Sequence, residues 1–99
     1  MLLEEEVFNG HDNIIALSLS IDKEAINHSG IVQVQLYVGS TLIDSIVNPD
    51  YFDTSNEDRL IIKLAHAGIK TGRYETRLII YDIFNPDGLV WGDIMLVVH

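Results

Sequence analysis

Acidic side chains are the most abundant chemically active groups in this sequence, with 15 aspartates and glutamates among 99 residues. Paired carboxylates can transfer protons, and clusters of them can bind a hard cation such as Ca²⁺. They are densest at Asp50, Asp53, Glu57 and Asp58. This spacing lacks the Asp-x-Asp-x-Asp-Gly core and the later Glu of an EF-hand loop. We therefore expect a polar acidic loop over residues 50–58, with a calcium site as the alternative.

The histidines are the next candidates for chemistry, and they are far apart, at His11, His28, His66 and His99. They form no His-Glu-x-x-His motif and no pair four residues apart, so their spacing does not indicate a metal site. The chain has no cysteine, no Gly-x-Ser-x-Gly elbow, no phosphate-binding loop and no dinucleotide fingerprint. We expect no catalytic residue, no metal and no cofactor, and hence a protein that is not an enzyme.

Charge is distributed unevenly along the chain. Residues 1–58 carry a net charge of −10 and residues 59–99 a net charge of +1, for a total of −9. A chain this acidic repels phosphate backbones, which argues against a nucleic-acid partner. The basic set is a candidate contact surface for the acidic half of another copy or of a partner protein. Its members are Arg59, Lys63, Arg73 and Arg77. The alternative is that both halves are simply solvated.

Four aromatic residues lie in or beside predicted loops. Tyr51 and Phe52 lie in the acidic loop, while Phe84 and Trp91 flank the turn Asn85-Pro86-Asp87-Gly88. Exposed aromatic side chains on loops are favoured anchors of protein interfaces. The other interpretation is that these rings close the ends of the hydrophobic core.

The elements that must position these residues are short apolar segments with a period of two, separated by turn residues. Seven can be recognised. They cover residues 2–8, 13–21, 32–38, 41–47, 59–65, 73–82 and 89–98. In the second segment Ile15, Leu17, Leu19 and Ile21 should face the core, and in the third Val32, Val34, Leu36 and Val38 should do so. The glutamates of the first segment suggest a solvent face or a protected sheet edge.

The fifth segment allows two structures. A capping pattern from Ser55 to Asp58 and the spacing of Leu60, Leu64 and Ala67 are compatible with a helix. The Leu60-Ile61-Ile62 run, with its β-branched isoleucines, and its period-two face favour a strand.

No membrane-spanning segment is expected, because the apolar runs fall far short of the roughly 20 residues needed. The acidic start, Glu4-Glu5-Glu6, predicts no secretion signal.

Gly72, just before the sixth segment, and Tyr74, near its start, have the pattern of a tyrosine corner. In that motif the tyrosine hydroxyl bonds to the backbone a few residues upstream, here near Ile69 or Lys70. About seven antiparallel strands together with this corner resemble an immunoglobulin-like or fibronectin III-like β-sandwich with Greek-key connections, so we expect one all-β domain over residues 1–99. The chain departs from antibody domains because it has no cysteine pair and its tryptophan, Trp91, lies in the last segment.

A closer resemblance comes from three stretches together: Ala67 to Tyr74, Leu78 to Asp82, and Asn85 to Gly92. This Ala-Gly-Ile-x-x-Gly-x-Tyr segment, with the following Ile-Tyr-Asp and the Asn-Pro-Asp-Gly-Leu-Val-Trp-Gly hairpin, is similar to small proteins encoded among the virion structural genes of tailed bacteriophages and prophages. Gly39 to Ser45 is similar as well.

The resemblance implies a virion structural or assembly role without enzymatic activity. It implies protein partners, either further copies of this chain or other virion proteins, and no membrane or nucleic-acid partner. The protein would then be found in the virion or in the host cytoplasm during assembly. The alternative function is a carbohydrate-dependent or calcium-dependent binding module.

Overall fold

The structure, a computed structural model, describes residues 3–11, 14–21, 24–25, 30–56 and 59–99, and the described residues form an all-β protein. Buried side chains alternate with more exposed ones along Ile15–Leu17, Gln33–Val38 and Gly72–Tyr81, as the period of two in the sequence predicts, whereas Leu60–Ile62 is buried at all three positions. The strands are β1 (Leu3–Val7), β2 (Ile15–Leu17), β3 (Ser20–Ile21), β4 (Glu24–Ala25), β5 (Gln33–Val38), β6 (Thr41–Asp44), β7 (Phe52–Asp53), β8 (Leu60–Ile62), β9 (Gly72–Tyr81) and β10 (Leu89–Val98).

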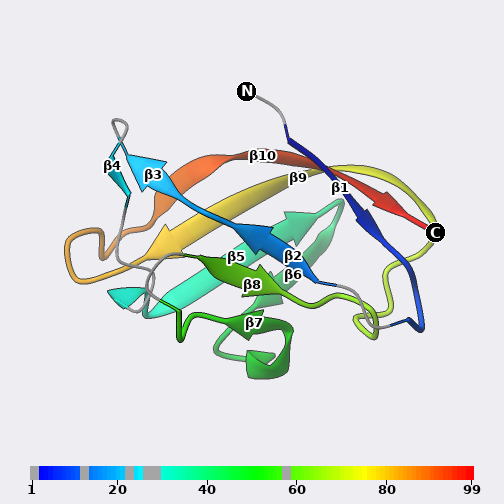
Figure 1. The fold of residues 1–99 in the computed structure, drawn as a ribbon, viewed down its shortest axis with the longest axis horizontal. Coiled ribbons are helices and arrows are strands. Elements are labelled where there is room, and N and C mark those ends of the chain that lie inside the picture. The colour runs from blue at the N-terminus through cyan, green and yellow to red at the C-terminus, as the bar shows by residue number, and fades with distance from the viewer. Residues whose placement is uncertain (1–2, 12–13, 22–23, 26–29, 57–58) are drawn as a thin grey trace.

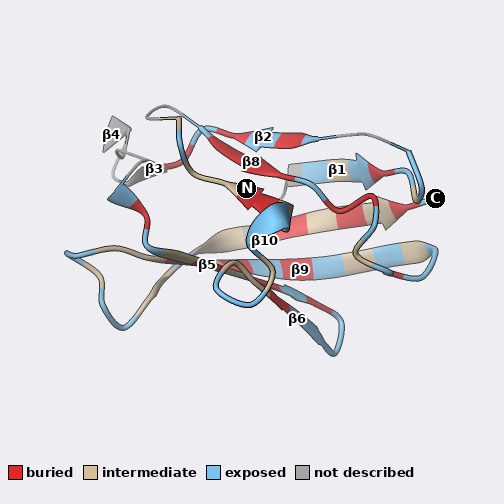
Figure 2. Ribbon diagram, turned by 90° about the horizontal axis from the view of Figure 1, so that it is seen from below, coloured by how far each residue is buried: buried red, intermediate tan, exposed pale blue. Residues whose placement is uncertain are grey.

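The strands form two main layers (Figures 1 and 2). A five-stranded sheet has the order β1-β10-β9-β5-β6, and a three-stranded sheet has the order β2-β8-β7. Within the described residues, β3 and β4 form a separate two-stranded sheet. The core contains Leu36, Leu78 and Leu96 from the larger sheet and Leu17 and Leu60 from the smaller one. The two sheets therefore share one hydrophobic core, as in a sandwich.

The first strand does not follow the antiparallel pattern expected for every strand. β1 pairs in parallel with β10, with Leu3 opposite Ile94 and Val7 opposite Val98, so the larger sheet is mixed. Alternating side chains reveal which face of a strand is buried but carry no information on the direction of its partner. The expectation that the glutamates mark an edge is confirmed, because β1 is the last strand of its sheet.

Strands β9 and β10 form the long hairpin of the molecule. Leu89 pairs with Ile80 and Val98 with Gly72, with an irregularity between Val90 and Gly92. The interior face of β9 presents Thr76, Leu78 and Ile80, all buried, and the other face looks outward.

Several predicted segments differ in their details. The strand prediction for residues 59–65 is confirmed by β8, which is shorter than the predicted segment. Val32 was expected in the core but lies before β5 and is 60% exposed. Ile21 lies in β3, and its side chain is outside the described part of the structure.

The acidic region predicted as a loop contains regular structure. A turn of 3₁₀ helix, η2 (Pro49–Tyr51), leads directly into β7, which pairs with β8. Proline in the first turn suits a helical start because its missing N–H group would have no helical partner there. Although most residues of this acidic region are polar, the side chain of Phe52 is buried, with 8% exposed, and packs in the core.

The tyrosine corner has the predicted contact. The hydroxyl of Tyr74 donates a 2.7 Å hydrogen bond to the carbonyl oxygen of Lys70, one of the two upstream groups expected. Gly72 has φ of +155°, which residues with a side chain rarely adopt. This contact ties the start of β9 to the loop before it.

Candidate contact surfaces

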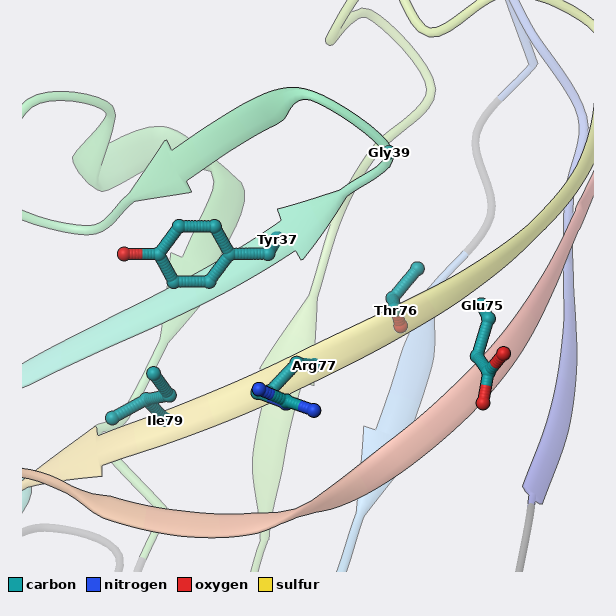
Figure 3. A pocket seen from close by; sticks show the side chains of 6 residues that line it. All are labelled: Tyr37, Gly39, Glu75, Thr76, Arg77 and Ile79. Atoms are coloured by element: carbon teal, nitrogen blue, oxygen red, sulfur yellow. The ribbon is translucent and has the colours of Figure 1, made fainter.

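The outer face of the five-stranded sheet is hollowed between β5 and β9 (Figure 3). The hollow has a volume of about 620 Å³ and is lined by Tyr37, Gly39, Glu75, Thr76, Arg77 and Ile79. We call it the face hollow. Tyr37 is directly opposite Arg77 in the sheet, because β5 and β9 pair in this register. The face hollow combines an aromatic ring, an aliphatic side chain and two opposite charges.

Polar side chains beside the face hollow form a connected network. The carboxylate of Asp44 accepts hydrogen bonds from the side-chain amides of Gln33, at 2.8 Å, and Gln35, at 3.0 Å. Its other oxygen accepts one from the backbone N–H of Ile46, at 2.8 Å. The hydroxyl of Tyr81 donates to the amide oxygen of Gln35, at 2.7 Å. The network joins β6, β5 and β9 across the outer face.

The pKa of Asp44 is shifted by this environment. Desolvation raises it, but the hydrogen bonds from Gln35, Ile46 and Gln33 together outweigh desolvation and lower the pKa below 3.8. The carboxylate is therefore held in its charged form, in which it accepts all three bonds. Its part is structural, because its oxygens are already engaged within the chain.

The turn between β9 and β10 presents two large apolar side chains to solvent. Ile83 is 76% exposed and Phe84 is 84% exposed. One carboxylate oxygen of Asp82 accepts hydrogen bonds from the N–H groups of Phe84, at 2.9 Å, and Asn85, at 2.7 Å. The backbone N–H of Gly88 then donates to the carbonyl of Asn85. The turn is therefore held in shape by its own hydrogen bonds, and we call Ile83 and Phe84 the apolar tip.

Other exposed apolar residues lie at the same end of the sheet. The N–H of Val32 donates to the carbonyl of Tyr81, and Val90 pairs with Ile79. The N–H of Ser45 donates to the carbonyl of Val34, which places the next residues, Ile46 and Val47, at this end as well. Val32, Ile46, Val47 and Val90 are all exposed. Large exposed apolar groups gathered in one region mark interaction sites more often than scattered ones do.

The opposite end of the sheet has a second hollow, of about 290 Å³. The residues lining it include Val38, Gly39, Thr41, Ile69, Lys70 and Tyr74. We call it the end hollow. Val38 and Ile69 are buried, whereas Lys70 is exposed, so the hollow has an apolar floor and a basic rim.

The predicted aromatic contacts fall into two groups. Phe52 is a core residue, and Tyr51 and Trp91 are partly buried against the core. Tyr51 also donates a hydrogen bond from its hydroxyl to the carbonyl of His66, at 3.2 Å. These three match the interpretation that the rings close the core. Phe84 is the one among the four that projects into solvent.

The predicted basic contacts do not form one patch. Arg73 and Arg77 are exposed on the outer face of β9. Arg59 directly precedes β8 and Lys63 directly follows it, in the other sheet, and both are exposed. A guanidinium nitrogen of Arg73 is 3.4 Å from a carboxylate oxygen of Glu4. Opposite charges from the two halves of the chain therefore contact each other within the molecule.

The acidic loop is only partly described, because Glu57 and Asp58 lie outside the described residues. Asp53 accepts hydrogen bonds from the hydroxyl and the backbone N–H of Ser55, at 2.6 and 2.9 Å. These bonds lower the pKa of Asp53, with a smaller effect from the charge of Lys63. Within the described part of the chain, no three acidic or histidine side chains are grouped closely enough to hold a metal ion.

Sequence reasoning did not find the face hollow, the end hollow or the apolar partners of Phe84. Tyr37 alternates with the apolar residues of its segment and is exposed, but nothing in the local sequence indicates that it lies opposite Arg77. Ile83 next to Phe84 was a usable signal, since two large apolar residues before an Asn-Pro-Asp-Gly turn cannot both face the core.

Comparison with known proteins adds no family to this description. No family model matches the chain, and no curated protein is similar to it in sequence. Among the residues that the structure describes, no helix is long and apolar enough to cross a membrane.

Proposed function

We propose that this chain is a non-enzymatic structural or assembly protein of bacteriophage or prophage virions and that it acts through protein–protein contacts. In this proposal it has an immunoglobulin-like fold with Greek-key connections, and it works in the virion or in the host cytoplasm during assembly. The phage assignment rests on the sequence resemblance in residues 67–92 and 39–45.

The strand order supports the immunoglobulin-like assignment. In variable-type immunoglobulin domains a sheet that contains the last strand packs on a smaller sheet built from earlier strands. Here β10-β9-β5-β6 forms most of one sheet and β2-β8-β7 forms the other. The hydrogen bond from Tyr74 to Lys70 adds the corner that accompanies this architecture.

The observation that carries the contact function is the apolar tip. Leaving Ile83 and Phe84 in water loses the free energy that burial would gain, about 1.5 to 3 kcal/mol for each side chain. The turn that presents them is already ordered by Asp82, so binding would cost little additional conformational entropy. Rigid, exposed aromatic side chains are typical anchors of protein interfaces.

A glycan-binding module is less well supported. It would bind through the four predicted rings, and three of them, Tyr51, Phe52 and Trp91, lie in or against the core.

A photocrosslinking experiment tests the proposed function. A photoreactive phenylalanine analogue is placed at position 84, and the chain is produced in cells that assemble the particles. The control carries the analogue at position 14, where Ile14 is also exposed but lies just before β2. Mass spectrometry should identify a virion or assembly protein, or a second copy of the chain, crosslinked at position 84. Crosslinks at position 84 that do not exceed those at position 14 would contradict the proposal.

A further inference from the structure

The apolar tip and the end hollow lie at opposite ends of the same hairpin. Strand β9 runs from Gly72, beside the end hollow, to Tyr81, beside the apolar tip. Figure 1 shows the turn after β9 and the loop before it at opposite ends of the molecule's long axis. With an extent of 35 Å along that axis, one molecule cannot place its own tip in its own hollow.

The end hollow can accept a side chain of the size of Phe84. Its volume of about 290 Å³ compares with roughly 30 Å³ for one water molecule in the liquid. Gly39, which lines it, adds no side chain, and the buried Val38 and Ile69 supply an apolar floor. An aromatic ring entering the hollow would displace water from apolar surface, which is favourable.

The charges around the two features are complementary. The segment from residue 82 to residue 90 carries Asp82 and Asp87 and no basic residue. The end hollow is lined by Lys70, whose ammonium group pairs with no described carboxylate. Opposite charges that meet at an interface orient the partners and disfavour other arrangements.

We infer that copies of this chain associate head to tail, with the apolar tip of one molecule seated in the end hollow of the next and Asp87 placed near Lys70. This inference rests on the proposed contact function and names its partner as a second copy of the chain. The two surfaces differ, so the contact is heterologous, and repetition of it builds a filament or closes a ring rather than stopping at a two-fold dimer.

Single contacts of this kind should be weak. The surface area buried when one turn enters one hollow is small compared with the interface of about 1,600 Å² that stable complexes bury. We therefore expect association at protein concentrations approaching 1 mM in solution, with multiple contacts in a particle supplying additional avidity.

Complementary variants provide the test. Phe84→Ser removes the aromatic ring of the apolar tip but keeps the end hollow, and Thr41→Trp fills the end hollow but keeps the apolar tip. Each variant alone should remain at the monomer mass of 11.1 kDa in sedimentation equilibrium. At about 1 mM total protein the average mass of their equimolar mixture should rise toward twice that value and not beyond it, because the two outer ends of the mixed dimer are both blocked. Ile14→Ser is the control, and it should associate like the unaltered chain.

A charge exchange gives a second readout on the same contact. Lys70→Glu and Asp87→Lys should each weaken association by about tenfold, and the chain with both changes should recover it. Circular dichroism and melting curves establish that each variant is folded before its mass is measured.

The outcomes separate this inference from the function on which it rests. A mixture that stays monomeric, or a dimer formed by one variant alone, overturns the head-to-tail contact. If position 84 still crosslinks to a different virion protein, the proposed function stands and only the partner was wrong. If it crosslinks to no protein, both fail.

Discussion

Asp44 shows how one side chain can organise the outer face of a sheet. Its carboxylate accepts hydrogen bonds from Gln33, Gln35 and Ile46, and through Gln35 it is connected to Tyr81. Three donors lie around one negative charge, so removal of that charge by protonation weakens all three bonds.

Asp44 should make the stability of the protein depend on pH. Its pKa is lowered in the folded state, so the unfolded chain takes up the proton first as the pH falls. This contribution to the free energy of unfolding is present above about pH 4 and is lost as the pH falls through the folded pKa. In chemical denaturation, the free energy of unfolding should fall less between about pH 6 and about pH 2 for Asp44→Asn than for the unaltered chain. Asp50→Asn is the control. Equal acid sensitivity of the Asp44 variant and the unaltered chain would be inconsistent with this role.

The hydroxyl group of Tyr74 allows a second test, of how much one hydrogen bond stabilises the fold. Tyr74→Phe deletes the hydroxyl that donates to Lys70 and should lower the free energy of unfolding by about 1 kcal/mol. Tyr37→Phe is the matched control, because the hydroxyl of Tyr37 donates to no described residue and its ring is on the outer face. Urea denaturation measures both. Equal changes in the two variants would show that the corner bond does not stabilise the fold.

The sequence carried enough information for some residues and not for others. The Gly-x-Tyr pattern predicts the bond from Tyr74 because donor and acceptor are four residues apart. Phe52 and Phe84 both appear as aromatic residues in polar loops. Their different burial depends on where each loop lies relative to the core, which no local pattern contains.

At the level of elements, the turn between β9 and β10 is set by Gly88. It has φ of +89°, and a Cβ there would lie 2.8 Å from Cε1 of Tyr81 and 2.9 Å from Cγ2 of Ile79. The turn can therefore pack this closely against β9 only without a side chain at position 88.

Substitution at two glycines should separate backbone strain from crowding. Gly10 also has positive φ, +76°, but a Cβ at that position would have open space within 4 Å. Gly10→Ala should cost about 1 kcal/mol for its backbone conformation. Gly88→Ala should cost about 2 kcal/mol more, because the methyl group also displaces Tyr81 and Ile79. Urea denaturation gives both values, and a Gly88 variant as stable as the Gly10 variant would disprove the close packing.

The boundaries and directions of strands were the weakest predictions at this scale. The segment at residues 41–47 ends early because Asp44 accepts the N–H of Ile46 and its carbonyl accepts the N–H of Asn48, which starts a turn. β7 has two residues, too few for a period of two to be visible. The parallel placement of β1 depends on how the chain passes between sheets, and alternation of side chains cannot report it.

For the molecule as a whole, the opposite charges of the two halves of the chain meet at Arg73 and Glu4. The pair is 3.4 Å apart and both side chains are largely exposed. Exposed pairs contribute little because water screens them and both side chains lose freedom. This pair therefore contributes little to the stability of the folded state.

A double-mutant cycle on Glu4→Gln and Arg73→Gln should give a coupling energy below about 1 kcal/mol. The free energies of unfolding of the two single variants, the double variant and the unaltered chain supply it. A coupling of several kcal/mol would mean that the charged halves hold the fold together, and surface charge would then not be available for contacts between molecules.

Association through the apolar tip is tested most directly by the solution mass of the unaltered chain and of Phe84→Ser over a range of protein concentrations. The mass is measured by sedimentation equilibrium at about 0.15 M salt. At this ionic strength the screening length is about 8 Å, so the electrostatic repulsion between the acidic molecules is short-ranged. If the chain associates head to tail, its mass rises above 11.1 kDa as its concentration increases, while Phe84→Ser remains a monomer. An unaltered chain that stays at 11.1 kDa up to about 1 mM, or a Phe84 variant that associates equally well, would contradict this association.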